Sequence, residues 1–220
     1  IENVSFGFEG AFAEAVRSGE AQALQRQHQA REDWGLAVGQ AFRESDWDDA
    51  KNGLLESFRS DRYASAKLKD TAVKVDADAA SAQISVTLDS GPAFRLGAMQ
   101  VKGLQRYPRW LLDRYDPPKE GESYSRTRLL DFQRSLQNSP YFASVAVQIE
   151  SDPEKAEAVP VEVSLTERKA RDLSFGAGYS SNTGFRGEIA YRDRDILNRA
   201  WDLRSAIRIE QKRQLGFADI

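Results

Sequence analysis

Residues 173–193 read LSFGAGYSSNTGFRGEIAYRD and carry glycines at a spacing that could hold a phosphate group. A dinucleotide-binding loop needs Gly-x-Gly-x-x-Gly between a strand and a helix, so that the pyrophosphate meets the helix N-terminus. Gly176 and Gly178 supply the first two glycines, but Ser181 stands where the third is required. The residues after Gly184 alternate between apolar and polar, which is typical of a strand. The sequence therefore favours a strand over a phosphate-binding loop.

Three other groups of side chains could do chemistry. His28 is the only histidine, so neither a Ser-His-Asp triad nor a multi-histidine metal site can be built around it. Asp46, Asp48 and Asp49 could hold a cation, but carboxylates in a first helical turn are expected from the helix dipole alone. Residues 193–195, Asp-Arg-Asp, are expected in a turn between two strands. We predict no catalytic residue, no metal site and no cofactor, and a protein that is not an enzyme.

The composition narrows the classes further. The net charge of -3 provides no general attraction for nucleic acid, and the absence of cysteine excludes disulfides, zinc-thiolate sites and thiol nucleophiles. No run of about 18 apolar residues could form a membrane-spanning helix. Because the chain starts at Ile1 without methionine and stops at Ile220 within a strand-like pattern, we expect a fragment of a longer protein.

The chain contains an internal repeat, which predicts its architecture. The sequence SFRSDRY from Ser57 aligns with SLQNSPYF from Ser135, and ISVTL at 84–88 aligns with VEVSL at 161–165. Each copy predicts a strand, helical sequence, a second helix and two strands. The first copy has a strand at 4–8, helical sequence over 12–34, a helix opened by a capping box at Ser45 with Ala50, Leu54 and Phe58 on one face, and strands at 65–76 and 82–89. The second has a strand at 94–101, a short helix around 110–112 and a helix after Ser125 with Leu129, Phe132 and Leu136 on one face. It ends with strands at 143–150 and 159–166, joined by a hairpin loop at 151–158.

The repeated unit resembles POTRA domains, the modules that precede outer-membrane barrels in Gram-negative assembly and secretion proteins. The resemblance rests on the β-α-α-β-β order, on GQAF at 39–42 and GESY at 121–124, and on VKG at 101–103. It implies an α+β fold with POTRA domains at 1–93 and 94–170. The three-stranded sheet of such a module has an edge that can accept an extended segment from another chain. We expect protein binding at the edge-strand positions Ala143, Val145, Val147 and Ile149.

The segment 171–220 alternates with a period of two residues and predicts three strands and the start of a fourth at Leu215. A turn is expected at 181–184, after the first strand. The first strand is apolar on one side and small or polar on the other, and the residues that define it are Leu173, Phe175, Gly176, Gly178 and Tyr179. This pattern, with aromatic residues near strand ends, indicates the start of a truncated transmembrane β-barrel. A soluble antiparallel sheet with one solvated face is the alternative.

The segment from Gly176 to Gln214 is also similar to the start of the barrel in the TamA family, the translocation and assembly module proteins. The similarity implies a role in inserting or secreting outer-membrane proteins such as autotransporters. It also implies client outer-membrane polypeptides, a TamB-like inner-membrane-anchored partner and contact with the lipid bilayer through the barrel. From the net charge of -3 we expect no nucleic acid as a partner. The expected location is the Gram-negative outer membrane, with the POTRA domains in the periplasm. General barrel-assembly proteins of the BamA kind and two-partner secretion transporters share these modules and stay open as alternatives.

Overall fold

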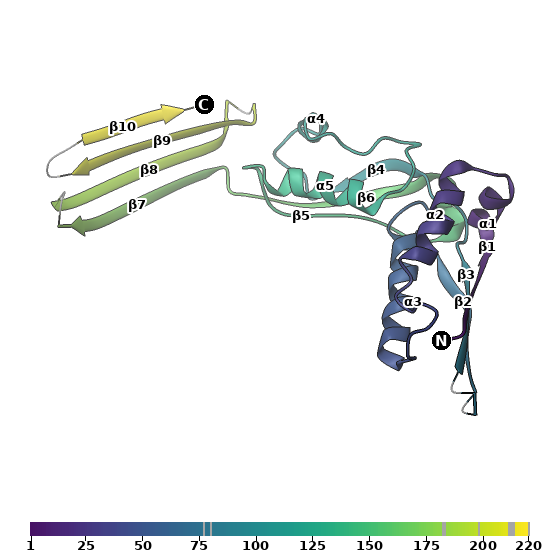
Figure 1. Cartoon of the computed structure of the whole chain (residues 1–220). Coiled ribbons are helices and arrows are strands. Elements are labelled where there is room, and N and C mark those ends of the chain that lie inside the picture. Colours follow the sequence, from purple (N-terminus) through teal and green to yellow (C-terminus); the bar gives the residue numbers. More distant parts are fainter. Residues whose placement is uncertain (77, 80, 182–183, 198, 211–213, 220) are drawn as a thin grey trace. The chain divides into compact units, whose positions relative to one another are not determined.

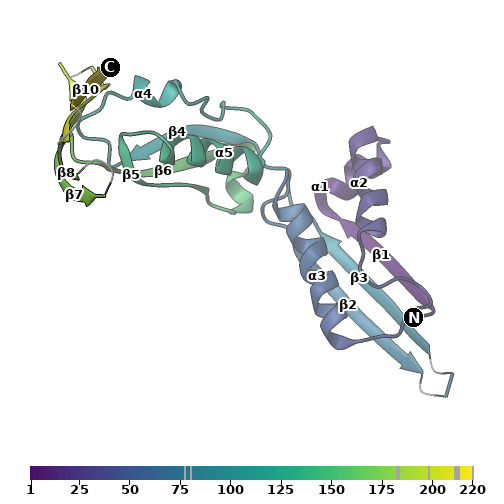
Figure 2. The same cartoon turned by 60° about the vertical axis from the view of Figure 1, so that its left-hand side comes forward.

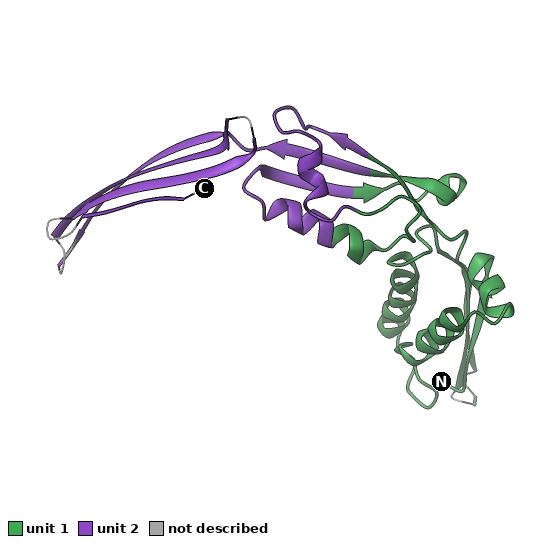
Figure 3. Ribbon diagram, turned by 90° about the horizontal axis from the view of Figure 1, so that it is seen from above, with its two compact units in different colours: residues 1–99, 118–130, 148–161 green, residues 100–117, 131–147, 162–220 purple. Residues whose placement is uncertain are grey.

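The computed structural model describes residues 1–76, 78–79, 81–181, 184–197, 199–210 and 214–219. The chain forms two compact units (Figure 3): residues 1–99, 118–130 and 148–161 in the first, and residues 100–117, 131–147 and 162–220 in the second. The division runs through the second repeat, so the domain boundaries after residues 93 and 170 stay predictions. None of the helices in the described part combines the length and hydropathy that a membrane-spanning helix needs.

The first repeat forms a three-stranded sheet with helices packed against it (Figures 1 and 2). The strands are β1 (Asn3–Glu9), β2 (Lys67–Asp76) and β3 (Ser81–Asp89), and the helices are α1 (Gly10–Arg17), α2 (Ala21–Glu32) and α3 (Glu44–Arg59). β3 lies in the centre, parallel to β1 and antiparallel to β2. Ile84, Val86 and Leu88 alternate along β3 and are buried with Phe12 and Phe58. The period-two pattern thus directs one sheet face into the core.

The prediction of helical sequence over 12–34 is confirmed for most of its length, and the predicted capping box at Ser45 is wrong. The helical stretch 12–34 is divided into α1 and α2, because Gly19 takes a φ of +80° after the end of α1, a conformation that glycine adopts without strain. Ser45 does not cap α3. The N-cap residue is Arg43, and the Ser45 hydroxyl donates to the Asp46 carboxylate instead, at 3.0 Å. The buried face of α3, with Ala50, Leu54 and Phe58, is as predicted.

The second repeat contains β4 (Leu96–Lys102), α4 (Trp110–Asp113), α5 (Arg126–Gln137), β5 (Phe142–Ile149), the 3₁₀ helix η1 (Pro153–Ala158) and β6 (Val159–Glu167). The sheet order is β4-β6-β5. The predicted apolar face of α5 is confirmed, since Leu129, Phe132 and Leu136 are buried. The segment 151–158, predicted as a hairpin loop, contains η1 because Asp152 accepts a hydrogen bond from the Glu154 amide at its N-terminus.

The last segment forms a four-stranded antiparallel sheet in the order β10-β9-β8-β7. Its strands are β7 (Arg171–Ser180), β8 (Gly184–Ile196), β9 (Trp201–Glu210) and β10 (Gln214–Asp219). The predicted turn at 181–184 lies partly outside the described residues. The expected turn at 193–195 is wrong, because these residues belong to β8. Asp193 is only 5% exposed there and Arg194 only 7%, since their charges are paired across the sheet.

A pair of glycine substitutions tests the close approach of the chain after β4 to β6 in the second repeat. Gly103 and Gly121 both have positive φ, +86° and +82°. A Cβ at Gly103 would overlap the carbonyl oxygen of Leu165, whereas no heavy atom lies within 4 Å of one at Gly121. We expect Gly121→Ala to cost about 1 kcal/mol from backbone strain alone, and Gly103→Ala to cost clearly more. Hydrogen exchange of the β6 amides measures the difference, and equal exchange in both variants would contradict the predicted overlap.

Candidate functional site

β5 lies at one edge of the β4-β6-β5 sheet, and no strand among the described residues pairs with its outer side. Val145 and Val147 are buried, Ala143 is exposed and Ile149 is half-buried. These four positions alternate along the strand and project to one face. The opposite row, with Ser144, Ala146 and Gln148, is exposed. An added strand at this edge would meet one apolar row and one row of small or polar side chains.

Two glutamines of α5 occupy part of this edge. The amide of Val147 donates to Oε1 of Gln133 at 2.9 Å. Nε2 of Gln137 donates to the carbonyl oxygen of Val145 at 3.2 Å. Gln133 and Gln137 are four residues apart and therefore lie on the same face of the helix. We call these two side chains the glutamine cap. Sequence reasoning did not select them, although their i,i+4 spacing in a helix before an edge strand is a usable signal.

β2, at an edge of the first sheet, is protected in a different way. It contains five charged residues, Lys67, Lys69, Asp70, Lys74 and Asp76, and its register shifts between Leu68 and Asp70. Charged side chains and bulges are common devices that prevent another strand from pairing with an exposed edge. β5 has the sequence FASVAVQI and contains no charged residue. The edge of β5 is therefore protected by neutral amide groups, whereas the edge of β2 is protected by charge and irregular register.

The four-stranded sheet presents an exposed apolar face. Phe175 is paired with Ile189, and Ile189 with Ile207, so that their side chains lie in a row across β7, β8 and β9. Phe175 is 73% exposed and Phe185 is 74% exposed. The face consists of Leu173, Phe175, Tyr179, Phe185, Ile189, Ile207 and Ile209, all of which are exposed. A contiguous face of this kind marks contact with a lipid or with another protein.

The other face of this sheet is polar in the strands β7 to β9. Arg208 forms an ion pair with Glu188 at 2.6 Å, across β8 and β9. Gly176 and Gly178 lie on this face, opposite Glu188 and Arg186, and a Cβ at Gly178 would come within 2.8 Å of the Arg186 side chain. Glycine here leaves room for the long side chains of the neighbouring strand. The apolar residues of β10 lie on a different face from those of β7–β9. Leu215 pairs with Arg208 and therefore lies on the polar face.

The connection between β8 and β9 is anchored within the second unit. The hydroxyl of Tyr141 donates to the carbonyl oxygen of Ala200 at 2.6 Å, and the Tyr141 ring packs against Tyr107 with centroids 5.0 Å apart. Burial raises the pKa of Tyr141, so the hydroxyl keeps its proton and acts as the donor. Arg194 adds a second link, because it donates to the Lys169 carbonyl at 3.0 Å. Residues of the second repeat thus hold the start of the sheet.

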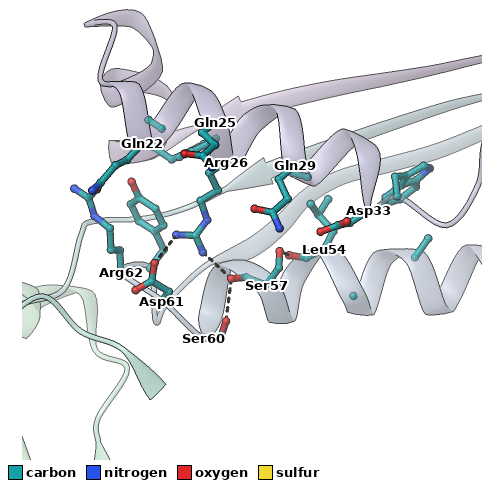
Figure 4. A pocket seen from close by; sticks show the side chains of 17 residues that line it. Gln22, Gln25, Arg26, Gln29, Asp33, Leu54, Ser57, Ser60, Asp61 and Arg62 are labelled. Atoms are coloured by element: carbon teal, nitrogen blue, oxygen red, sulfur yellow. Dashed lines mark hydrogen bonds and ion pairs between the residues drawn. The ribbon is translucent and has the colours of Figure 1, made fainter. Parts of the chain in front are cut away.

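A groove of about 640 Å³ runs between α2 and α3 (Figure 4). Arg26 crosses it, donating to the Ser57 carbonyl at 2.6 Å and to Asp61 at 3.1 Å, while its guanidinium lies 4.7 Å from the centre of the Phe58 ring. Burial lowers the pKa of Arg26, and the charge of Asp61 opposes that effect. Because the guanidinium is engaged by the chain itself, this cation joins the two helices and is not positioned to receive an anion.

The side chains first considered for chemistry are dispersed in the structure. His28 is exposed and lies 3.3 Å from Glu32 on the same helix. Asp48 pairs with Lys51 at 2.8 Å. Within the ranges that the structure describes, no group of three or more histidine, aspartate or glutamate side chains could hold a metal ion.

Known structures share this fold, although no family model matches the chain. BamA from Haemophilus ducreyi lacking POTRA domains 1-3 aligns with a TM-score of 0.66 and 18% identity, over 83% of this chain and 34% of that chain. POTRA3-5 of Haemophilus influenzae BamA aligns with a TM-score of 0.52 and 17% identity, over 76% of this chain and 61% of that chain.

CdiB from Acinetobacter baumannii aligns with a TM-score of 0.50 and 14% identity, over 94% of this chain and 38% of that chain. The chain thus spans only 34% to 61% of the length of these three structures. The likeness shows a mixed α+β fold of the POTRA-containing type.

The anchor of the β8–β9 connection can be tested by removing one hydroxyl. Tyr141→Phe deletes the hydrogen bond to Ala200 and should destabilise the connection by about 1 kcal/mol. Tyr107→Phe is the matched control, because it removes a hydroxyl from the ring that packs against Tyr141 and leaves the hydrogen bond to Ala200 intact. Hydrogen exchange at Ala200 and Trp201 should accelerate in the first variant and change little in the second. If hydrogen exchange accelerates equally in both variants, the effect comes from the packing of the two rings and not from the hydrogen bond to Ala200.

Proposed function

We propose that the chain is part of an outer-membrane protein assembly or secretion factor. In this proposal the two repeats are POTRA domains in the periplasm, and β7–β10 are the first strands of a transmembrane barrel. The observation that carries the proposal is the exposed apolar face of β7–β9 directly after the second repeat. The likeness to a BamA structure over 83% of the chain supports it.

The proposed activity is binding and not chemistry. An extended segment of a client outer-membrane polypeptide pairs with the edge of β5, at Ala143, Val145, Val147 and Ile149, and is passed toward the membrane. The first barrel strand, with Leu173, Phe175, Gly176, Gly178 and Tyr179, provides a second edge for pairing, because β7 ends the four-stranded sheet. Neither step requires a cofactor.

Within this class we propose a TamA-like protein that acts on clients such as autotransporters together with a TamB-like inner-membrane-anchored partner. The support is the sequence of β7 and β8, GAGYSSNTGFRGEIAYRD, with its resemblance to the start of TamA barrels. A two-partner secretion transporter is the second candidate, favoured by the alignment of CdiB over 94% of the chain. A BamA-type general assembly protein is the third.

The membrane proposal predicts a difference between the two faces of β8. The chain contains no cysteine, so single cysteines can carry a fluorophore. Ile189→Cys places the dye on the apolar face, and Ala190→Cys places it on the polar face. In detergent micelles containing a nitroxide-labelled lipid, we expect strong quenching at position 189 and weak quenching at position 190. Equal quenching at the two positions would favour the soluble antiparallel sheet.

The binding proposal predicts that the β5 edge loses its partner when a backbone donor is removed. A photo-reactive amino acid at the exposed Ser144 should crosslink a synthetic peptide of residues 201–210, used as an outer-membrane-type strand. Val147→Pro removes the outward amide and should reduce crosslinking several-fold. Val147→Ala is the control, because it truncates the same side chain but keeps the amide. An equal loss in both variants would attribute binding to the side chain.

A further inference from the structure

The backbone groups that the glutamine cap occupies are the ones that a docking strand needs. The carbonyl of Val145 and the amide of Val147 are an acceptor and a donor on the outer side of β5. A neighbouring strand would engage such groups through its own amides and carbonyls. A glutamine side chain ends in the same chemical group as a peptide bond, with one acceptor oxygen and a donor nitrogen. The glutamine cap therefore imitates a short piece of a partner strand.

We propose that the glutamine cap is a displaceable guard of the β5 edge, which an incoming strand removes by exchanging its own backbone for Gln133 and Gln137. This inference rests on the proposed function, since it describes how the same edge is regulated. The guard keeps the edge satisfied while no client is bound. It gives way to a segment that offers equivalent hydrogen bonds along more of the strand.

The contrast with β2 supports a reversible guard at β5. The five charges and the register shift of β2 are fixed in its sequence and oppose pairing with any partner. β5 contains no charge of its own that would resist a partner, and its protection comes entirely from another element, α5, where the edge is occupied. Long glutamine side chains can rotate away without moving the helix. The edge at β5 is therefore closed in a way that can be reversed.

The side-chain rows of β5 specify the occupant. A strand added beside β5 continues the buried row of Val145 and Val147 on one face and the exposed row of Ser144, Ala146 and Gln148 on the other. The matching segment is extended, with apolar residues at alternate positions and small or polar residues between them. β7 and β9 of this chain have that alternation. The occupant we infer is an outer-membrane strand before its insertion.

Two isosteric substitutions, each of which adds one negative charge, separate this inference from a general effect of charge on strand binding. Gln133→Glu keeps the acceptor for the Val147 amide and strengthens the bond, because the acceptor is now charged. Gln137→Glu removes the donor and places a carboxylate against the Val145 carbonyl, which opens the cap. Relative to the unmodified chain, we expect the first variant to bind a strand more weakly and the second to bind it more tightly. The affinities of the two variants should differ by about tenfold or more.

The measurement uses the full chain in detergent micelles with the photo-reactive residue at Ser144. The peptide of residues 201–210 is titrated, and the concentration that gives half-maximal crosslinking is compared among the unmodified chain, Gln133→Glu, Gln137→Glu and the double variant Gln133→Ala/Gln137→Ala. The double variant should resemble Gln137→Glu. Hydrogen exchange at Val147 reports the cap without any peptide and should slow in Gln133→Glu.

The outcomes are distinguishable. Opposite shifts in the two glutamate variants support the guard. Shifts in the same direction, or four equal affinities, overturn the guard while leaving strand binding at β5 intact. Absence of crosslinking in all four proteins, including the double variant without the cap, overturns the proposed binding role of β5 and the guard together.

Discussion

The unpaired backbone groups at the edges of its sheets are the constraint on which the rest of this structure depends. Each of the three sheets ends in strands whose outer amides and carbonyls need partners or protection. β2 is protected by charge and a register shift, and β5 by the glutamine cap. These solutions differ in one property that matters for binding. The first is permanent, and the second can be exchanged for another strand.

The four-stranded sheet adds a second constraint, because its apolar face has no cover. An exposed face that contains Phe175, Phe185, Ile189 and Ile207 is unfavourable in water at about 25 cal/mol for each Å² of apolar surface. Burying it in a lipid bilayer removes that cost. The polar face, with cross-strand pairs such as Arg208 and Glu188, is suited to a wet interior. The proposed barrel role therefore accounts for both faces, because one would contact lipid and the other would line the wet interior.

Much of this fold could be predicted from local patterns. The strands of both repeats and of the last sheet follow from alternation, and the buried face of α3 follows from Ala50, Leu54 and Phe58 at helical spacing. The errors arose where a local signal competes with another partner for the same side chain. Asp193 and Arg194 have the composition of a turn, but their ion pairs with Arg171 and Asp172 extend β8 through them. Ser45 has the composition of a cap, but its hydroxyl is used by Asp46.

The glutamine cap shows a different limit of sequence reasoning. The edge position of β5 can be inferred from the order of elements, but the cap depends on two helical side chains reaching a strand that follows them in the chain. Nothing in the composition of Gln133 or Gln137 distinguishes them from exposed helical residues, because glutamine is a common helix former. Their i,i+4 spacing in a helix before an edge strand is a signal, but it takes the three-dimensional distance between their amides and the edge to show that they cap it.

The choice of amides at this edge has a physical consequence. A lysine that guards an edge must give up its hydration when a partner strand docks, and removing a charge from water costs several kcal/mol. A neutral side-chain amide contributes only about 0.5–1.5 kcal/mol to the closed edge, because water competes for the same hydrogen bonds. The glutamine cap is therefore strong enough to satisfy Val145 and Val147 in the free protein, and weak enough that a strand pairing over several residues can replace it. Neutral amides suit an edge that must open, just as charges suit an edge, like that of β2, that must stay closed.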